Sequence, residues 1–199
     1  TPVVCDPTPG SQSALERARG AVRTYIAPLL ASRNDEKPAA LVEHVREWLD
    51  AASREGVFVV LGDYGSGKST FANAYYLEHS QWHSAFRQTL RTIVVLDLKR
   101  RRELGTVDQW LAAEMSANGV AVRDVSECLA WFRATKCVVI LDSFEEMSLR
   151  PSEDELVSNA IFVRRVAEAA RTILFSRTHL FTGVSEITRF ARSMSSTVS

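Results

Sequence analysis

The feature that most constrains this chain is a run of eight residues that reads G-D-Y-G-S-G-K-S and ends at Ser69. It fits the pattern G-x-x-x-x-G-K-[ST] and comes directly after the apolar run at 57–61. Glycines in such a loop let the backbone curl so that successive N–H groups point at phosphate oxygens, and the following helix adds the positive end of its dipole. The sequence therefore predicts a strand, a phosphate-binding loop and a helix, with a nucleoside triphosphate as ligand.

The residue types in this loop predict individual contacts. Lys68 is expected to reach the β- and γ-phosphates, and the Ser69 hydroxyl to ligate Mg²⁺. Tyr64 either braces the turn or packs outward, and these two alternatives stay open. The residues expected to bind the nucleotide are Gly62, Asp63, Tyr64, Gly65, Ser66, Gly67, Lys68, Ser69 and Thr70.

A second motif, V-V-I-L-D-S-F-E-E, spans residues 138–146. Its four apolar residues predict a buried strand that delivers Asp142 to the edge of the sheet, where it can hold the Mg²⁺ shell together with Ser69. A carboxylate on the loop that follows can orient or deprotonate an attacking water. Glu146 is our first choice for that catalytic role and Glu145 is its alternative.

A third motif, I-L-F-S-R-T at 173–178, places an arginine just beyond another apolar strand. The planar guanidinium of Arg177 suits phosphate, so we expect it to sense the γ-phosphate as a catalytic residue. The competing interpretation is an arginine in a solvated loop.

Strands and helices alternate along the rest of the chain, which predicts an α/β fold with right-handed crossovers and a mostly parallel sheet. Helices are expected at about 11–32, where Pro28 kinks or ends the first helix, and at 39–54, ahead of the first strand. We divide the chain into an N-terminal arm, helix and linker (1–38) and a nucleotide-binding domain (39–199). In the sequence, one clear strand, at 92–98, lies between the phosphate-binding motif and the acidic motif.

Composition narrows the possible partners. Lys plus Arg and Asp plus Glu balance at 24 each, so no global field attracts nucleic acid or a membrane. The basic run at 99–102 is expected to be a solvated loop rather than a nucleic-acid site. Three cysteines with no metal-ligand spacing fit a reducing compartment, and no apolar run is long enough to span a membrane. We therefore expect a cytoplasmic protein for which nucleic acid is an unlikely partner.

The three motifs in this order resemble the NACHT branch of the STAND NTPases, P-loop proteins related to the AAA+ ATPases. The family pattern has a strand ending L-D-G-hydrophobic-D-E and a later strand ending T-S-R-P; this chain has L-D-S-F-E-E at 141–146 and F-S-R-T at 175–178. Ser143 stands for the usual glycine, Glu145 for aspartate and Thr178 for proline. The resemblance covers about residues 40–180 and implies a three-layer P-loop sandwich preceded by helices.

What the resemblance implies about function is a switch that binds ATP or ADP with Mg²⁺, hydrolyses ATP slowly and controls self-oligomerisation in a larger signalling or defence protein. Effector and sensor domains, and a winged-helix domain, are then expected outside this sequence. P-loop folds with an added strand between the two motif strands form the hydrolysing group with a catalytic glutamate. The alternatives are an AAA+-type motor acting on nucleic acid or protein, a small-molecule phosphotransferase, and a nucleotide-held scaffold without turnover.

Overall fold

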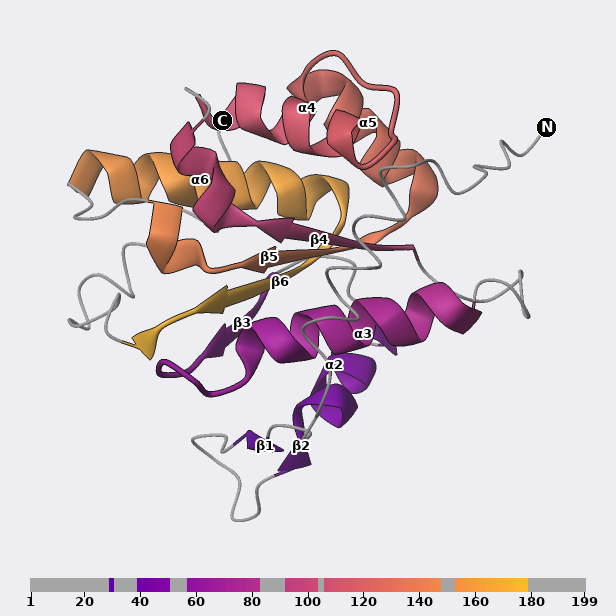
Figure 1. Ribbon diagram of the computed structural model, residues 1–199, viewed down its shortest axis with the longest axis vertical. Helices are drawn as coiled ribbons and strands as arrows, with labels where there is room; N and C mark the ends of the chain where they lie inside the picture. The colour runs from indigo at the N-terminus through magenta and orange to yellow at the C-terminus, as the bar shows by residue number, and fades with distance from the viewer. Residues whose placement is uncertain are drawn as a thin grey trace.

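The computed structural model describes residues 29–30, 39–50, 57–82, 92–103, 106–147 and 153–178. At its centre lies a sheet of four parallel strands in the order β3-β6-β5-β4. These strands are β3 (Val57–Leu61), β4 (Ile93–Asp97), β5 (Val138–Asp142) and β6 (Arg171–Ser176). Because all four run in one direction, their carboxyl ends share one edge of the sheet, and the segments that follow them meet there (Figure 1).

The order of the strands differs from their order in the sequence. The strand expected at 92–98 is β4 and lies at the edge of the sheet, whereas β6 lies between the two motif strands β3 and β5. Burial explains this order, because β5 and β6 are apolar and buried almost throughout while β3 and β4 are partly exposed. The added strand is therefore the one that leads to Arg177.

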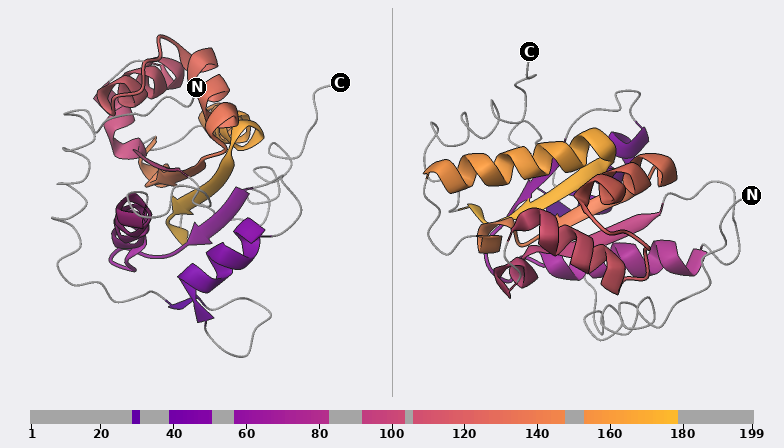
Figure 2. Two further views of the ribbon diagram at one scale, coloured as in Figure 1. Left: turned by 90° about the vertical axis from the view of Figure 1, so that its right-hand side faces the viewer. Right: turned by 90° about the horizontal axis from the view of Figure 1, so that it is seen from above.

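Two helical layers cover the sheet. Val138 and Ile140 of β5 pack on the side of α2 (Leu41–Asp50) and α3 (Lys68–Trp82). Val139 and Leu141 face the opposite core, which includes α4 (Val107–Ala117), α5 (Val125–Thr135) and α6 (Glu153–Ala169). Figures 1 and 2 show the two layers on either side of the sheet. This alternation follows from the two-residue period of a strand and confirms the predicted three-layer α/β arrangement.

The helices begin where the sequence supplies capping side chains. Thr106 and Gln109 form a reciprocal capping box at the start of α4. Asp124 accepts a hydrogen bond from the backbone of Glu127 at the start of α5, and Lys136 ends that helix with a φ of 50°. These local signals fix the starts of the two helices at Val107 and Val125.

The basic run after β4 is not the solvated loop that was predicted. It forms the 3-10 helix η1 (Leu98–Glu103). Arg100 forms an ion pair with Glu114 of α4 at 2.8 Å, and Arg101 donates to Asn159 Oδ1 of α6 at 3.2 Å. These two side chains therefore have a structural role: they join η1 to α4 and α6.

The N-terminal prediction is wrong in one respect. Leu29–Leu30 forms the short strand β1, which pairs antiparallel with β2 (Ala39–Ala40), so the helix expected to run to about residue 32 does not include these two residues. The rest of that helix and the linker lie outside the described residues, and the division at residue 38 stays a prediction. Helix α2 buries Leu41, Val45 and Leu49, as its apolar stripe predicts. Within the described residues, no helix combines the length and the apolar character needed to cross a membrane.

Candidate functional site

The phosphate-binding motif lies at the carboxyl edge of the sheet, in the turn between β3 and α3. The Gly62 N–H donates to the Ser176 carbonyl at 3.1 Å, which fixes the start of the loop to β6. A Cβ at Gly62 would lie 2.7 Å from Ser66 Oγ, so a larger residue there requires the Ser66 side chain to move. Gly65 and Gly67 have φ of +78° and +87°, the left-handed region that side chains disfavour. The path of the loop therefore favours glycine at these two positions.

The Lys68 ammonium is folded back on the same loop. Its Nζ donates to the carbonyls of Gly62 at 2.5 Å and Asp63 at 3.0 Å, and to Ser66 Oγ at 3.1 Å. Burial lowers the pKa of Lys68 from its ordinary value, and the charges of Glu145 and Asp142 oppose that shift. The first turn of α3 contains no acidic residue. The loop and the start of α3 therefore present positive charge and leave the helix N-terminus free for an anion.

Asp142 ends β5 and meets α3 across the site. The Ser69 hydroxyl forms a hydrogen bond with its carboxylate, and burial raises the pKa of Asp142, with Asp97 adding to the shift. The residue is only 6% exposed, and its Oδ1 atom has no hydrogen-bond partner. The two side chains that the sequence assigns to Mg²⁺ are therefore in direct contact, with one carboxylate oxygen to spare.

Arg177 connects the third motif to the second. Its Nε lies 3.0 Å from Glu145 Oε1 and its Nη2 lies 3.1 Å from Glu146 Oε1. Its backbone N–H also donates to Glu145 Oε2 at 3.2 Å. Both acids belong to the 3-10 helix η2 (Phe144–Met147). The side chain is bound to two carboxylates, so Arg177 is not an arginine of a solvated loop.

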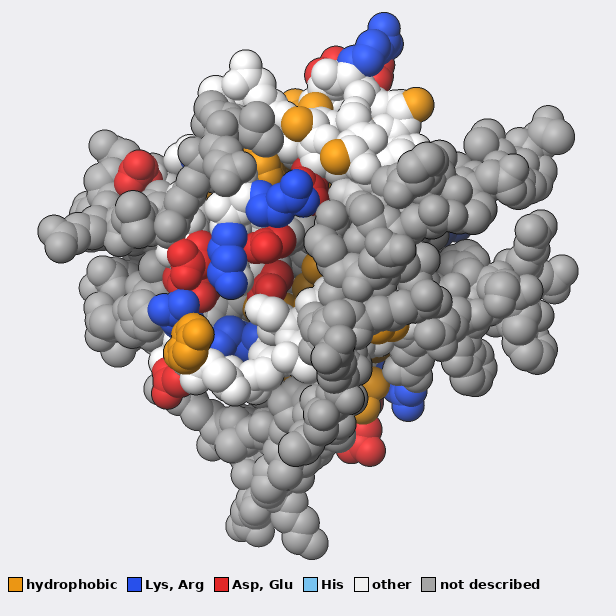
Figure 3. Space-filling model, in the orientation of Figure 1, with side chains coloured by type: hydrophobic (Ala, Val, Ile, Leu, Met, Phe, Trp, Pro, Cys, Tyr) orange, Lys and Arg blue, Asp and Glu red, His pale blue; other side chains and the backbone are white. Residues whose placement is uncertain are grey.

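The third motif also reaches the phosphate loop. The Arg177 guanidinium lies 5.4 Å from the centre of the Tyr64 ring, and Thr178 Oγ1 donates to Asp63 Oδ1. Tyr64 is 88% exposed, which decides between the two alternatives: its ring lies outward, over the arginine. On the face shown in Figure 3, acidic and basic side chains gather between η2 and the phosphate loop.

The two candidate catalytic acids differ in their surroundings. The Glu145 side chain is 8% exposed and the Glu146 side chain is 21% exposed. Among the acids, Glu145 has the largest influence on Lys68. Both acids lie at the site, and their assignment as catalytic residues stays a prediction.

Two further residues of the site were not singled out by sequence reasoning. Asn73 lies one turn into α3, and its Nδ2 donates to the Ser69 carbonyl at 2.8 Å. Asp97 ends β4 and is aligned with Asp142 in the sheet register. The signal for Asp97 is present in the sequence, because it ends an apolar strand just as Asp142 does. Thr70 lies in the first turn of α3, and its contact with a nucleotide stays a prediction.

The atoms that these residues present fit a nucleotide bound with Mg²⁺. The buried, unpartnered Oδ1 atom of Asp142 beside the Ser69 hydroxyl supplies the oxygen ligands that Mg²⁺ prefers. Among the described residues, Lys68 donates to neutral oxygen atoms of the loop, which a phosphate can replace with charged ones. The positive-φ glycines leave open space where a Cβ would otherwise stand.

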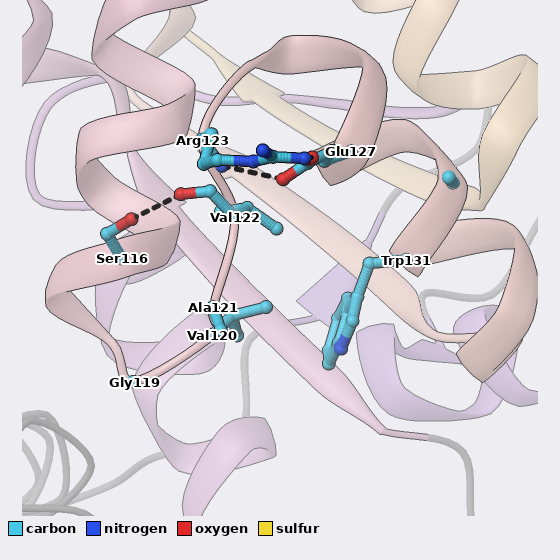
Figure 4. A pocket seen from close by; sticks show the side chains of 9 residues that line it. Ser116, Gly119, Val120, Ala121, Val122, Arg123, Glu127 and Trp131 are labelled. Atoms are coloured by element: carbon cyan, nitrogen blue, oxygen red, sulfur yellow. Dashed lines mark hydrogen bonds and ion pairs between the residues drawn. The ribbon is translucent and has the colours of Figure 1, made fainter.

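A separate groove of about 780 Å³ lies between α4 and α5, and none of the three motifs lines it. Figure 4 shows the connecting loop along one side and Trp131 on the other. Trp131 is half-buried: it packs against the core and also faces this groove. The lining residues are Ser116, Gly119, Val120, Ala121, Val122, Arg123, Glu127, Ala130 and Trp131.

Comparison with known proteins gave similarities in structure. No protein-family model matches the chain, and no curated protein matches it in sequence. Among solved structures, the chain is similar to one described as "Structure of Drosophila ORC bound to DNA", with a TM-score of 0.46 and 15% sequence identity. That alignment covers 99% of this chain, which spans 55% of the length of the matched chain.

The strand order and the position of the motifs define the fold. A wholly parallel sheet in the order β3-β6-β5-β4, with a glycine-rich loop joining the edge strand β3 to a helix and an acid ending the buried strand β5, is that of a P-loop NTPase-like α/β sandwich. The ordered motifs that distinguish one branch of these proteins from another bear on function, which is proposed below.

Proposed function

We propose that this chain binds ATP and ADP with Mg²⁺, hydrolyses ATP slowly, and serves as the nucleotide-controlled regulatory module of a larger signalling or defence protein of the NACHT type. The observation that carries the proposal is the hydrogen bond between Ser69 and Asp142. It joins the phosphate loop to the acidic strand at the one place where a metal ion can contact both a protein carboxylate and a phosphate. The order of the three motifs along the chain supports the choice of branch.

Binding depends on the positive elements of the loop. The curled amides at 62–67 and the start of α3 receive the phosphates, and Lys68 exchanges its carbonyl partners for β- and γ-phosphate oxygens. Ser69 and Asp142 hold the metal ion, which when bound neutralises the charge that develops on the phosphate oxygens. Asn73 stabilises the helix turn that presents Ser69, because it donates to the Ser69 carbonyl.

Hydrolysis requires a carboxylate next to the γ-phosphate. A water attacks the γ-phosphorus while the bond to the β–γ bridging oxygen breaks, which gives ADP and inorganic phosphate. Glu146 is the proposed acceptor of the water's proton, with Glu145 as the alternative. In the described structure both carboxylates are bound to Arg177, so either must be released before it can act.

Arg177 supplies the link between nucleotide state and conformation. Its guanidinium has two competing sets of anionic partners, the acids of η2 and the γ-phosphate of a bound triphosphate. A γ-phosphate that attracts Arg177 frees η2, and its loss restores the ion pairs. The proposed role in self-oligomerisation, and the dependence on effector and sensor domains elsewhere, extend this local change by family resemblance.

The same ion pairs favour a second candidate function. If Arg177 never releases the acids, the chain holds nucleotide without turnover and acts as a scaffold. Measured phosphate release from wild type, well above that of Glu146→Gln and Glu145→Gln, distinguishes the ATPase from the scaffold. General-base contributions are typically about 10²- to 10⁴-fold, so one of the two variants should lose at least about 100-fold in turnover.

Nucleotide binding is tested by titration of ATP and ADP in the presence of Mg²⁺. Lys68→Ala is expected to weaken ATP binding at least about tenfold, because a charge-assisted contact to phosphate is lost. The matched control is Arg133→Ala, which removes one exposed cation from α5 on the other side of the sheet. Equal affinity in Lys68→Ala and wild type would show that the nucleotide does not bind at this loop.

A further inference from the structure

The carboxyl edge of the sheet contains a second acid that the nucleotide mechanism does not use. Asp97 of β4 and Asp142 of β5 are partners in the parallel register. Aligned residues on neighbouring strands lie about 4.8 Å apart and point to the same face. Ile93 and Val95, at the same alternation as Asp97, belong to the core under α2 and α3. Asp97 therefore lies on the α3 side of the sheet.

Asp142 lies on that side too. Val138 and Ile140 belong to the same core, and Ser69 at the start of α3 contacts Asp142. Two carboxylates and a hydroxyl thus converge where β4, β5 and α3 meet. Within the same group, Oδ1 of Asp142 is buried and has no hydrogen-bond partner.

Like charges placed directly opposite each other on neighbouring strands destabilise a sheet. Of the two lysines near this pair, Lys99 is exposed and Lys68 donates its hydrogen bonds to oxygen atoms of the phosphate loop. A divalent cation is the ligand that resolves the conflict, because it accepts several carboxylate oxygens at once.

We infer that Asp97 is a third protein ligand at the divalent-cation site, so that this chain binds Mg²⁺ or Mn²⁺ before any nucleotide is present. The inference deepens the proposed function, since it concerns the same metal site, but it needs no bound phosphate. A P-loop site with one carboxylate and one hydroxyl relies on the phosphates of the nucleotide to complete its metal shell. With Asp97, the chain supplies two carboxylates of its own.

Asp97 also has a structural contact that must be separated from this role. Its Oδ1 accepts a hydrogen bond from the backbone N–H of Lys99 at 3.1 Å and so caps the start of η1. Asparagine caps as well as aspartate but has no charge. Asp97→Asn therefore keeps the cap and removes the metal ligand, which makes it the informative substitution.

The test is a titration of the full chain with Mn²⁺ in the absence of nucleotide. Binding is measured as the decrease in the electron spin-resonance signal of free Mn²⁺. Mn²⁺ is the probe because it takes the same oxygen ligands as Mg²⁺. Wild type is expected to bind one ion, and Asp97→Asn to bind it at least about 10- to 100-fold more weakly, because even the loss of an outer-shell partner of a metal ligand costs that much. Asp142→Asn locates the site and is expected to abolish binding. The matched control, Asp50→Asn, removes an exposed acid at the end of α2 and leaves binding unchanged.

Thermal unfolding gives a second readout. With Mg²⁺ at ten times the wild-type dissociation constant, the Tm of wild type should rise by about 3–6 °C, and that of Asp97→Asn by less than about 2 °C. Without metal, Asp97→Asn should be at least as stable as wild type, because the opposed charges are gone. A lower Tm without metal, or wild-type Mn²⁺ affinity in this variant, would overturn the inference and leave Asp97 as a cap.

The same titration repeated with ATP separates this inference from the proposed function. If Mn²⁺ binds only together with ATP, the inference that the chain binds the cation before any nucleotide is refuted, and the proposal that it binds ATP is unaffected. Failure of both Mn²⁺ and Mn²⁺-ATP to bind overturns the two together.

Discussion

The ion pairs between Arg177 and η2 can be measured by double-mutant cycles. Glu145 receives two bonds from Arg177, at 3.0 Å from Nε and 3.2 Å from the backbone N–H, and only 8% of its side chain is exposed. Glu146 receives one bond at 3.1 Å and is 21% exposed. Exposed ion pairs contribute about 0–1 kcal/mol, whereas removing one partner of a buried pair costs about 3–5 kcal/mol. The Arg177–Glu145 pair lies between these limits.

We therefore expect Arg177→Ala to lower the free energy of unfolding by about 1–3 kcal/mol, chiefly because Glu145 loses its partner. The cycle with Glu145→Gln should give a coupling energy of about 1–2 kcal/mol, and the cycle with Glu146→Gln less than about 1 kcal/mol. Urea unfolding of the four proteins in each cycle, without nucleotide, provides the values. The reasoning is refuted if the Glu146 coupling equals or exceeds that of Glu145.

The remaining predictions concern the loop, a buried thiol and a helix end. Gly67→Ala forces a side chain into a φ of +87° and should destabilise the loop by about 1–2 kcal/mol and weaken ATP binding, measured by titration; unchanged affinity would mean that the loop tolerates the strain. Burial raises the pKa of Cys137 from 9.0 to about 11, so the unfolded chain loses its thiol proton first and stability should fall by about 2–3 kcal/mol between pH 9 and 11. Chemical unfolding across that range should show a shallower fall in Cys137→Ala, and an identical profile would contradict the assignment. Lys136→Gly removes the backbone strain of a side chain at a φ of 50° at the exposed end of α5, and should raise the free energy of unfolding by about 0.5–1 kcal/mol. A lower free energy of unfolding would show that contacts of the lysine side chain stabilise the protein by more than the strain costs.

Local patterns in the sequence determine most of the elements and the residue types of the site. The apolar runs at 57–61 and 138–141, the glycine spacing of the loop and the caps Thr106 and Asp124 each act over a few residues. They therefore predict a strand, a turn or a helix start without knowledge of the rest of the chain. The loop residues and Asp142 were identified this way because parallel strands bring their carboxyl ends to one edge.

The tertiary structure decided how those elements meet. Strands β5 and β6 are both apolar enough for the centre of a sheet. Their packing against the helices on both faces of the sheet decided that β6 lies between β3 and β5. That placement, with 31 or more positions between the partners, is what brings Arg177 onto both η2 acids. It also turned a predicted solvated run into η1, because Arg100 and Arg101 found partners on α4 and α6. The alignment of Asp97 with Asp142 has the same origin, since register between strands depends on non-local contacts that no short segment of sequence contains.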